Sequence, residues 1–368
     1  MHTPPGTIQR LARSAGIGAL AFAATAGFAD TISPPSHSAS LAVGESTTVR
    51  KKVVIEKQPT AALLDIMFVF DITGSMSGAI NNAKASANGV INALSGFGDV
   101  RTGVGWYADP TYNGVKTNLG SRAATVASIN ALGACNSGQG YHSVLCGGDL
   151  PEVGYAGIRD AASNADWRPG SNRFVIALGD ASFKTGPDAA KDNITGARAA
   201  LEAANVNLFG LDFGAGFGAS ISTLGGSVYS GGTTPENMAS AILEGVTAGL
   251  AAYGKVSVDN LLAGLPHIGV STSCVTADVG TCSGDSAVGD FDRSITREFE
   301  FDVTYTRLTE GDTAFDSHAM VDGGIVASVR DTFASTVVGG GEVPEPGSLA
   351  LMALGLLGLR AVQRRRDS

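Results

Sequence analysis

Two hydroxyls and a carboxylate on one short turn give this sequence its clearest potential for metal chemistry. The turn, Asp71-Ile-Thr-Gly-Ser-Met76, follows the apolar run 64–70 and precedes a segment with helical periodicity. It offers the carboxylate of Asp71 and the hydroxyls of Thr73 and Ser75, which are hard oxygen donors. Mg²⁺ takes few protein ligands of this kind and keeps several waters. The turn therefore predicts a site for Mg²⁺ or the similar Mn²⁺.

Two more acidic turns occur at element boundaries further along the chain. Gly147-Gly-Asp-Leu-Pro-Glu152 opens a helix-like segment, and Leu178-Gly-Asp180 follows the apolar run 173–178. In open α/β sheets, sites form where the carboxyl ends of parallel strands meet, so we expect the three turns to converge at one sheet edge. The alternative is that the polar groups of the first two turns only cap the helices that follow them.

The elements that must position these turns are predicted to form an open, mostly parallel α/β sheet. Continuous apolar runs are typical of strands buried on both faces, and apolar spacings of three and four residues are typical of helices. The two patterns alternate along the chain, which favours parallel strands joined by right-handed helical crossovers. The expected strands are 64–70, 100–107, 173–178 and 206–213, and the expected helices are 77–95, 122–133, 152–165, 187–204 and 235–252.

Strand-like segments lie on both sides of this α/β region, which we place at residues 63–253. Residues 38–57 contain two β-branched runs around Gly44-Glu45, and apolar and polar residues alternate in several stretches of 254–337. A β segment of about 20 residues alone would leave its edges unpaired. We therefore predict that 38–57 pairs with 254–337 in a small β-sandwich, into which the α/β region is inserted.

The three turns, in this order and at these boundaries, resemble the metal-ion-dependent adhesion site of the von Willebrand factor type A domain. The first motif of that family is D-x-S-x-S, and residues 71–75 read D-I-T-G-S, which keeps a hydroxyl at the substituted position. The second turn is similar to the integrin β-subunit form, in which an acidic residue follows a D-x-P step, as in Asp149-Leu-Pro-Glu152. The resemblance covers residues 63–252 and implies a doubly wound, mostly parallel sheet.

The resemblance also implies a role for each candidate site residue. The direct metal ligands would be Ser75, Glu152 and Thr73, and the ligands that act through water would be Asp71 and Asp180. A second cation, Ca²⁺, would be held by Asp149 and Glu152 with the carbonyl of Pro151. Integrin β-subunits carry paired acidic residues after the serine-methionine step, whereas this chain reads Ser77-Gly-Ala-Ile80. The resemblance therefore does not extend to their adjacent regulatory metal site.

The four cysteines are even in number, which predicts disulfides in an exported chain. Their close spacings favour two bonds, Cys135–Cys146 and Cys274–Cys282, although other pairings stay open. Zinc binding is the alternative, but the sequence has no C-x-x-C pair. The loop 135–146 precedes the second acidic turn, where integrin β-subunits carry a specificity-determining loop. Tyr141 and His142 in this loop are therefore candidate ligand contacts.

Both ends of the chain have the pattern of targeting segments. Residues 1–29 carry arginines, an apolar run and then small residues, which is the order of a secretory signal peptide. Residues 342–366 contain Pro-Glu-Pro, an apolar stretch and Arg364–Arg366, and together these resemble the PEP-CTERM sorting tail. In that family an exosortase-type enzyme removes the helix after export in Gram-negative bacteria. This implies a transient membrane association, then a place at the cell surface or in its matrix. A retained one-span anchor is the alternative.

The net charge and the residue types in the acidic turns argue against two classes of function, nucleic-acid binding and catalysis. The net charge is −9, from 25 basic and 34 acidic residues, which argues against a nucleic-acid partner. The acidic turns contain no histidine or lysine base, so we expect a binding protein and not an enzyme. An open position on the cation would accept an oxygen from a protein or polysaccharide ligand. The expected function is exported, metal-dependent adhesion; the alternatives are a structural matrix protein with a non-functional site and a metal-dependent hydrolase.

Overall fold

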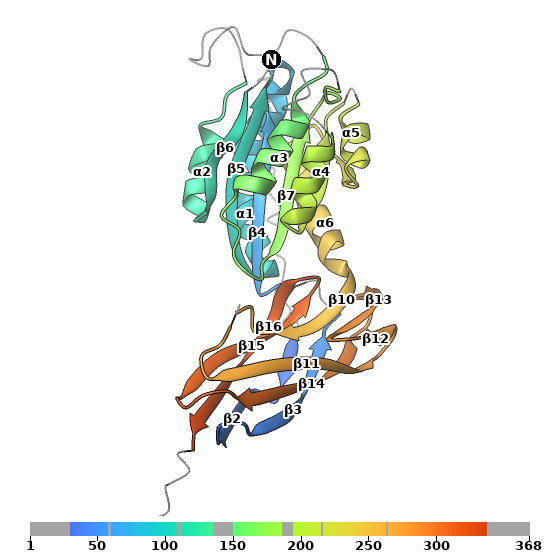
Figure 1. Ribbon diagram of the computed structural model, residues 1–368. Coiled ribbons are helices and arrows are strands. Elements are labelled where there is room, and N and C mark those ends of the chain that lie inside the picture. Colours follow the sequence, from blue (N-terminus) through green and yellow to red (C-terminus); the bar gives the residue numbers. More distant parts are fainter. Residues whose placement is uncertain are drawn as a thin grey trace, which may run out of the picture.

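The computed structural model describes residues 30–57, 60–108, 112–134, 150–185, 194–214, 216–262 and 264–336. The expected signal peptide, the expected sorting tail and the cysteine loop 135–146 lie outside these ranges. The described chain forms two units stacked end to end (Figure 1). One unit combines helices with a mostly parallel sheet, and the other consists of two further sheets.

A six-stranded sheet forms the middle layer of the α/β unit. Its strands are β4 (Leu63–Asp71), β5 (Asp99–Ala108), β6 (Tyr112–Gly120), β7 (Asn172–Gly179), β8 (Val206–Asp212) and β9 (Ser227–Ser230). They lie in the order β6-β5-β4-β7-β8-β9, and all neighbours are parallel except β5 and β6. The first strand in the chain, β4, is therefore central, as in sheets whose connections run outward in both directions.

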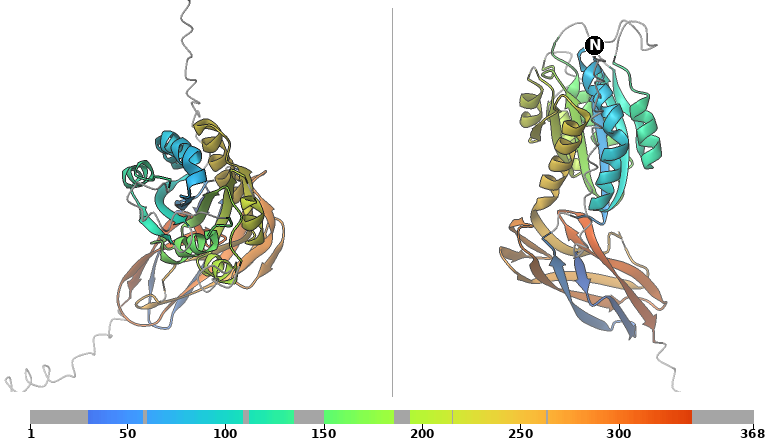
Figure 2. Two further views of the ribbon diagram at one scale, coloured as in Figure 1. Left: turned by 90° about the horizontal axis from the view of Figure 1, so that it is seen from above. Right: turned by 180° about the vertical axis from the view of Figure 1, so that it is seen from behind.

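Helices cover both faces of this sheet because its central strands are apolar on both sides. Along β4, Ile66, Phe68 and Phe70 pack into one core, and Met67 and Val69 pack into the other. The first core is covered by α1 (Ser77–Leu94), α2 (Arg122–Asn130) and α6 (Pro235–Ala251), and the second by α3 (Gly154–Asn164), α4 (Ile194–Ala203) and α5 (Phe217–Thr223). Figure 2 shows α1 and α6 side by side on the face seen from behind.

The second unit is a β-sandwich. Its four-stranded sheet contains, in spatial order, β1 (Thr31–Ser33), β3 (Ser46–Ile55), β14 (Arg297–Arg307) and β11 (Ile268–Ala277). Its six-stranded sheet contains, in spatial order, β12 (Thr281–Ser283), β13 (Ser286–Asp292), β10 (Ala252–Asp259), β15 (Thr313–Val321), β16 (Gly324–Ser335) and β2 (Ser36–Leu41). Alternating apolar side chains from both sheets, among them Phe299, Phe301 and Phe333, meet in one core.

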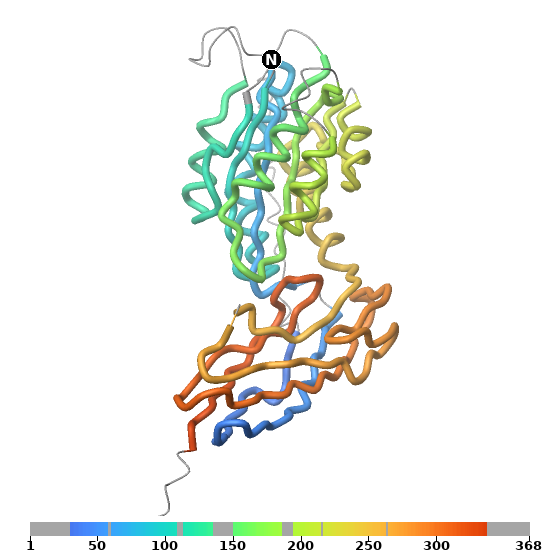
Figure 3. Tube along the Cα trace, viewed as in Figure 1, coloured from blue at the N-terminus to red at the C-terminus, as the bar shows by residue number. Residues whose placement is uncertain are grey.

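The segment that precedes the α/β unit contributes to both sheets of the sandwich. β3 pairs antiparallel with β14, from Arg297 opposite Ile55 to Thr306 opposite Ser46. β2 pairs parallel with β16 at the edge of the other sheet. The chain crosses between the units twice, after β3 and after α6 (Figure 3). The α/β unit is thus an insertion into the sandwich.

The sandwich contacts the amino-end edge of the α/β sheet. The backbone N–H of Ile325, at the start of β16, donates to Gly170 O at 2.6 Å, and Ala62 N donates to Ile325 O at 3.0 Å. The buried Arg293 guanidinium forms an ion pair with Asp30 at 2.8 Å and donates to carbonyls at the end of α6 and after β3. Because Ala62 and Gly170 precede β4 and β7, the carboxyl ends of these strands lie at the far end of the molecule.

Several elements have no clear signal in the sequence. α5 spans only seven residues, too few to show a helical period. β6 is an edge strand of mostly polar residues in which Leu119 is the only described side chain that is buried, β11 buries only Ile268, and β12 is exposed throughout, so their apolar pattern is weak. β9 is also absent from the strands predicted for the α/β region. The sequence therefore predicts the buried strands of the α/β sheet better than the edges of either unit.

Candidate metal-binding site

The first and third acidic turns follow two neighbouring strands. Asp71 is the last residue of β4, and the pairing of β4 with β7 runs up to Phe70 opposite Leu178. Asp180 follows directly after β7, so its turn lies beside the turn that begins at Asp71. Parallel register thus brings two segments that are distant in sequence to the same edge of the sheet, as strand order at a sheet edge predicts.

The second acidic turn is docked onto the third by backbone hydrogen bonds. Glu152 N donates to Ser182 O at 2.8 Å, and Lys184 N donates to Glu152 O at 2.8 Å. These bonds form a short parallel bridge between Glu152 and Phe183. Glu152 therefore reaches this edge through the loop after β7, although no strand contains it.

The ring of Phe183 fixes the bridge in the core. It makes edge-to-face contacts with Tyr107, Tyr155 and Phe217, at centroid distances of 5.9, 5.0 and 5.5 Å. Gly154 leaves room for this ring, because a Cβ at that position would lie 2.0 Å from it. Phe183 and Gly154 support the site without offering ligands, and sequence analysis missed both, since a single aromatic or glycine near a turn carries no distinctive pattern.

The polar groups of the first turn are tightly connected. The carboxylate of the fully buried Asp71 accepts hydrogen bonds at Oδ1 from Thr73 N (2.9 Å) and Thr73 Oγ1 (2.7 Å). The hydroxyls of Thr73 and Ser75 lie 3.4 Å apart, and Ser75 is exposed. The turn thus presents two adjacent hydroxyl oxygens next to a held carboxylate.

The alternative interpretation, in which the acidic turns only cap helices, finds no support in the capping contacts. The N-cap residue of α1 is Met76 and that of α3 is Val153, and neither helix has a side-chain cap hydrogen bond. The short 3₁₀ helix Gly74–Met76 also lacks one at its N-cap, Thr73. The Asp71 carboxylate instead orders its own turn.

The donor set fits a hard cation. Glu152 is buried, and Oδ1 of Asp180 is shielded from solvent with no hydrogen-bond partner among the described residues. A buried carboxylate oxygen normally has a partner, and a metal-bound water would supply one. Carboxylates and hydroxyls together are the ligands that Mg²⁺ and Ca²⁺ prefer.

Hydroxyl ligands are essential to this interpretation. Within the described ranges, no three histidine, cysteine, aspartate or glutamate side chains gather into a group that could hold a metal ion. A cation at this edge therefore needs Thr73 and Ser75 in addition to the carboxylates. Asp149, expected at a second cation, lies outside the described residues, as do Tyr141, His142, Cys135 and Cys146.

Comparison with protein families identifies one segment. Residues 342–366 match the PEP-CTERM protein-sorting motif. This motif indicates a protein that is exported from a Gram-negative bacterium, is anchored in the membrane before processing, and is processed by an exosortase. No curated protein matches the sequence. In the part of the chain that the structure describes, no helix is long and apolar enough to cross a membrane.

Similar solved structures come from matrix and adhesion proteins. One is proximal thread matrix protein 1 from the mussel byssus, with 15% identity over 54% of this chain and a TM-score of 0.38. A second structure of that protein, with a zinc-occupied MIDAS motif, gives 16% identity, 54% coverage and a TM-score of 0.40. The pilus adhesin SpaC from Lactobacillus rhamnosus GG gives 12% identity over 79% of this chain and a TM-score of 0.36. The match spans 48%, 48% and 46% of those chains, respectively.

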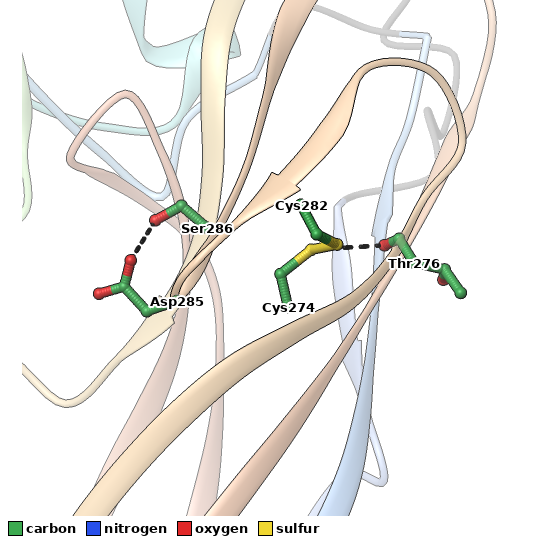
Figure 4. The surroundings of a disulfide bond; sticks show 5 residues. All are labelled: Cys274, Thr276, Cys282, Asp285 and Ser286. Carbon is green, nitrogen blue, oxygen red and sulfur yellow. Dashed lines mark hydrogen bonds between the residues drawn. A yellow bond between two sulfur atoms is a disulfide. The ribbon is translucent and has the colours of Figure 1, made fainter.

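One of the two expected disulfides lies in the described part of the chain. Cys274 in β11 and Cys282 in β12 are joined, with their Cα atoms 5.3 Å apart (Figure 4). The bond lies in the sandwich, in the other unit from the acidic turns, and closes the turn between two exposed strands. It therefore stabilises the sandwich and takes no part in the candidate metal site.

Proposed function

We propose that this protein is an exported, metal-dependent binding protein that recognises a surface or matrix ligand. In this proposal the α/β unit is a von Willebrand factor type A-like, doubly wound domain. The observation that carries the proposal is the meeting of the three acidic turns at one sheet edge. Two contacts support it: β4 and β7, which Asp71 and Asp180 end and follow, are neighbours in parallel register, and a backbone bridge joins Glu152 to Phe183. Among the described residues, the three carboxylates alone do not form a group that could hold a metal ion, so the proposal includes the hydroxyls of Thr73 and Ser75.

Each side chain has a distinct role in the proposed site. Thr73, Ser75 and Glu152 bind the cation directly, and Asp71 and Asp180 bind its waters. Asp71 also orients Thr73 through the 2.7 Å hydrogen bond between their side chains. When bound, the cation supplies an open coordination position for an acidic oxygen of the ligand. None of these five groups is a histidine, lysine or cysteine, which favours binding over hydrolysis.

The shape of the molecule supports an adhesive role. The acidic turns lie at the end of the α/β unit that faces away from the sandwich (Figure 1). β16 begins at the junction of the units and runs away from the site towards the sorting motif at 342–366. The described chain thus ends after β16, on the side of the sandwich away from the acidic turns, and the sorting motif follows in the sequence. This arrangement suits a protein that holds a ligand away from a surface.

The test is metal and ligand binding by the exported full chain. Calorimetric titration with Mg²⁺ should show one site in the wild type and none in Asp71→Ala. Capture of surface components should be lost with EDTA and with Asp71→Ala alike. Ser95→Ala is the matched control, because Ser95 is an exposed hydroxyl at the other end of α1. If the amount of captured surface components is unchanged by EDTA and by Asp71→Ala, while the wild type still binds Mg²⁺, the result would favour a structural matrix protein.

The second cation is a separate part of the proposal. Asp149 and Glu152 would share a Ca²⁺, with Glu152 contributing to both metals. Glu152→Ala should then abolish binding of Mg²⁺ and Ca²⁺, whereas Asp149→Ala should affect Ca²⁺ alone. Equal, unaltered affinities in the two variants would reject this arrangement.

Processing of the tail is the last part of the proposal. Pro344 and Pro346 disfavour helix in the residues before them, so the sequence favours an extended segment, which is the form that would enter the cleft of a processing enzyme. We expect cleavage close to Pro346. Mass spectrometry of the exported protein tests this, and a mature chain that still ends in Asp367-Ser368 would mean that the tail is retained.

A further inference from the structure

A lysine and an aspartate lie fully buried in the centre of the sandwich. Lys51 in β3 and Asp331 in β16 both have side chains with 0% exposure, and Lys51 Nζ lies 2.9 Å from Asp331 Oδ1. β3 belongs to the four-stranded sheet and β16 to the six-stranded sheet, so the pair bridges the core from one sheet to the other. By contrast, the adjacent residues Arg50 and Lys52 form their ion pairs, with Asp302 and Glu298, on the outer face of β3.

The second carboxylate oxygen of Asp331 is held by two hydroxyls. Tyr305 OH donates to Asp331 Oδ2 at 2.9 Å, and Ser317 Oγ donates to the same atom at 2.5 Å. The rings of Tyr305, Phe315 and Phe333 pack around this group, with centroids 4.7–6.0 Å apart. The carboxyl group is therefore fixed in place, polarised by two donors and screened from bulk water.

A histidine completes the group. His37 in β2 lies opposite Asp331 in the parallel register, so both side chains point to the same face of the sheet. Its ring stacks on Tyr305 at 5.9 Å, and its Nε2 is shielded and has no hydrogen-bond partner within the described ranges. Burial lowers the pKa of His37, which favours the neutral imidazole, a proton acceptor.

If Lys51 and Asp331 form only an ion pair, their burial costs folding free energy, because both charges lose their contact with water. Two charges removed from water seldom stabilise a fold as well as apolar side chains of similar size, and Phe299 and Phe301 show that apolar residues fill this core readily. What the pair does offer is chemistry: an amine in contact with a carboxyl group, with hydroxyl donors on one carboxyl oxygen. We propose that Lys51 and Asp331 condense into an isopeptide bond that joins the two sheets covalently.

The reaction is balanced without an external reagent. A proton passes from the Lys51 ammonium to the Asp331 carboxylate, which leaves a neutral amine and a neutral acid in the dry core. Nζ then forms a bond to Cγ of Asp331, and one Cγ–O bond breaks. The nitrogen loses a second proton, carried by His37 to the departing hydroxyl, so that one water leaves and nothing is oxidised or reduced. Tyr305 and Ser317 stabilise the charge that develops on Oδ2.

The bond would lie on the path of mechanical load. The chain beyond β16 leads to the sorting motif, and β3 leads through residues 56–62 to β4 and Asp71. A link from Asp331 to Lys51 connects these two strands directly, so pulling on the tail would not strip β16 from its sheet. The inference stands on the sandwich alone and does not depend on the metal site.

Peptide mapping of the purified full chain tests the bond. Trypsin cuts after Arg50, Lys52 and Arg330, so the cross-linked protein should yield a branched peptide. This peptide joins Lys51-Lys52 to the peptide that begins at Asp331, with a mass one water lower than the sum of the two. Recovery of only linear peptides from the wild type would overturn the proposal.

Variants identify the groups that act. Asp331→Ala should give no branched peptide, and the matched control Asp316→Ala should give it in full, because Asp316 is an exposed partner of Arg330. The double change Tyr305→Phe with Ser317→Ala keeps Lys51 and Asp331 in place and should slow formation of the branched peptide at least tenfold. An unchanged rate in that variant would remove the two hydroxyls from the mechanism.

Discussion

At the scale of single residues, the hydroxyl of Thr73 distinguishes a metal site from a structural turn. The Thr73 hydroxyl donates to Asp71 Oδ1 and lies 3.4 Å from the hydroxyl of Ser75. In the proposed site this one oxygen both holds the Asp71 carboxylate and binds the cation. Thr73→Ser keeps this oxygen and should keep Mg²⁺ binding close to that of the wild type. Thr73→Val, which has the same shape without the oxygen, should weaken binding by roughly 100-fold. Calorimetric titration compares the two, and equal affinities would show that Thr73 only orders the turn.

Two partly buried histidines link stability to pH. Burial lowers the pKa of His37 and of His318 below the ordinary value of 6.5. As the pH falls through about 6.5, the unfolded chain takes up protons that the folded protein does not, so the free energy of unfolding decreases. The contribution of the two neutral histidines to the free energy of unfolding is therefore complete above about pH 6.5 and is lost below it. Urea unfolding at about pH 7.5 and about pH 5.5 measures the loss.

The matched variant carries His37→Phe and His318→Gln. Without these imidazoles, the unfolding free energy should change less between the two pH values, because the unfolded chain no longer takes up protons at these two positions. An identical change in wild type and variant would assign the pH dependence to other groups.

At the scale of elements, two helical glycines have opposite expected effects. Gly89 in α1 has open space where a Cβ would lie, so Gly89→Ala should raise the unfolding free energy by roughly 0.5–1 kcal/mol. Gly154 at the start of α3 would place a Cβ 2.0 Å from the Phe183 ring, so Gly154→Ala should lower it by about 1–3 kcal/mol. Urea unfolding of the two variants tests this contrast.

The same clash has a consequence for the site. Phe183 is bridged to Glu152, so displacement of its ring moves the turn that carries this carboxylate. Gly154→Ala should therefore weaken Mg²⁺ binding as well as stability, whereas Gly89→Ala should leave binding unchanged. Wild-type affinity in Gly154→Ala would mean that the bridge does not position Glu152.

At the scale of the whole molecule, one buried arginine joins the two units. Arg293 forms an ion pair with Asp30 at 2.8 Å and donates to Leu250 O and Glu56 O, so it connects the N-terminal segment, the end of α6 and the end of β3. Asp30→Ala leaves a buried guanidinium without its carboxylate, which should lower the unfolding free energy by about 3–5 kcal/mol. The control Asp302→Ala removes an exposed pair with Arg50 and should have little effect. Equal losses in the two variants would contradict this role of Arg293.

Much of the α/β unit can be predicted from the sequence because its signals are local. A strand such as β4 is buried on both faces, so its central run Ile66–Phe70 is entirely apolar, and α1 shows its buried face at every third or fourth residue. The turn 71–75 likewise carries its hydroxyls and carboxylate within five residues. The sorting motif is recognisable for the same reason, since its three parts are contiguous.

Tertiary structure decides what depends on pairing between distant segments. Glu152 joins the loop after Asp180 through two backbone hydrogen bonds. Such bonds do not require particular side chains, so no sequence pattern predicts them. Lys51 stands between Arg50 and Lys52 and reads as part of a solvated basic run, yet the pleat of β3 turns it alone into the core. Sequence thus determined which groups are available. Strand register and burial determined which of them meet, because the free energy of a buried contact is realised only when both partners leave water together.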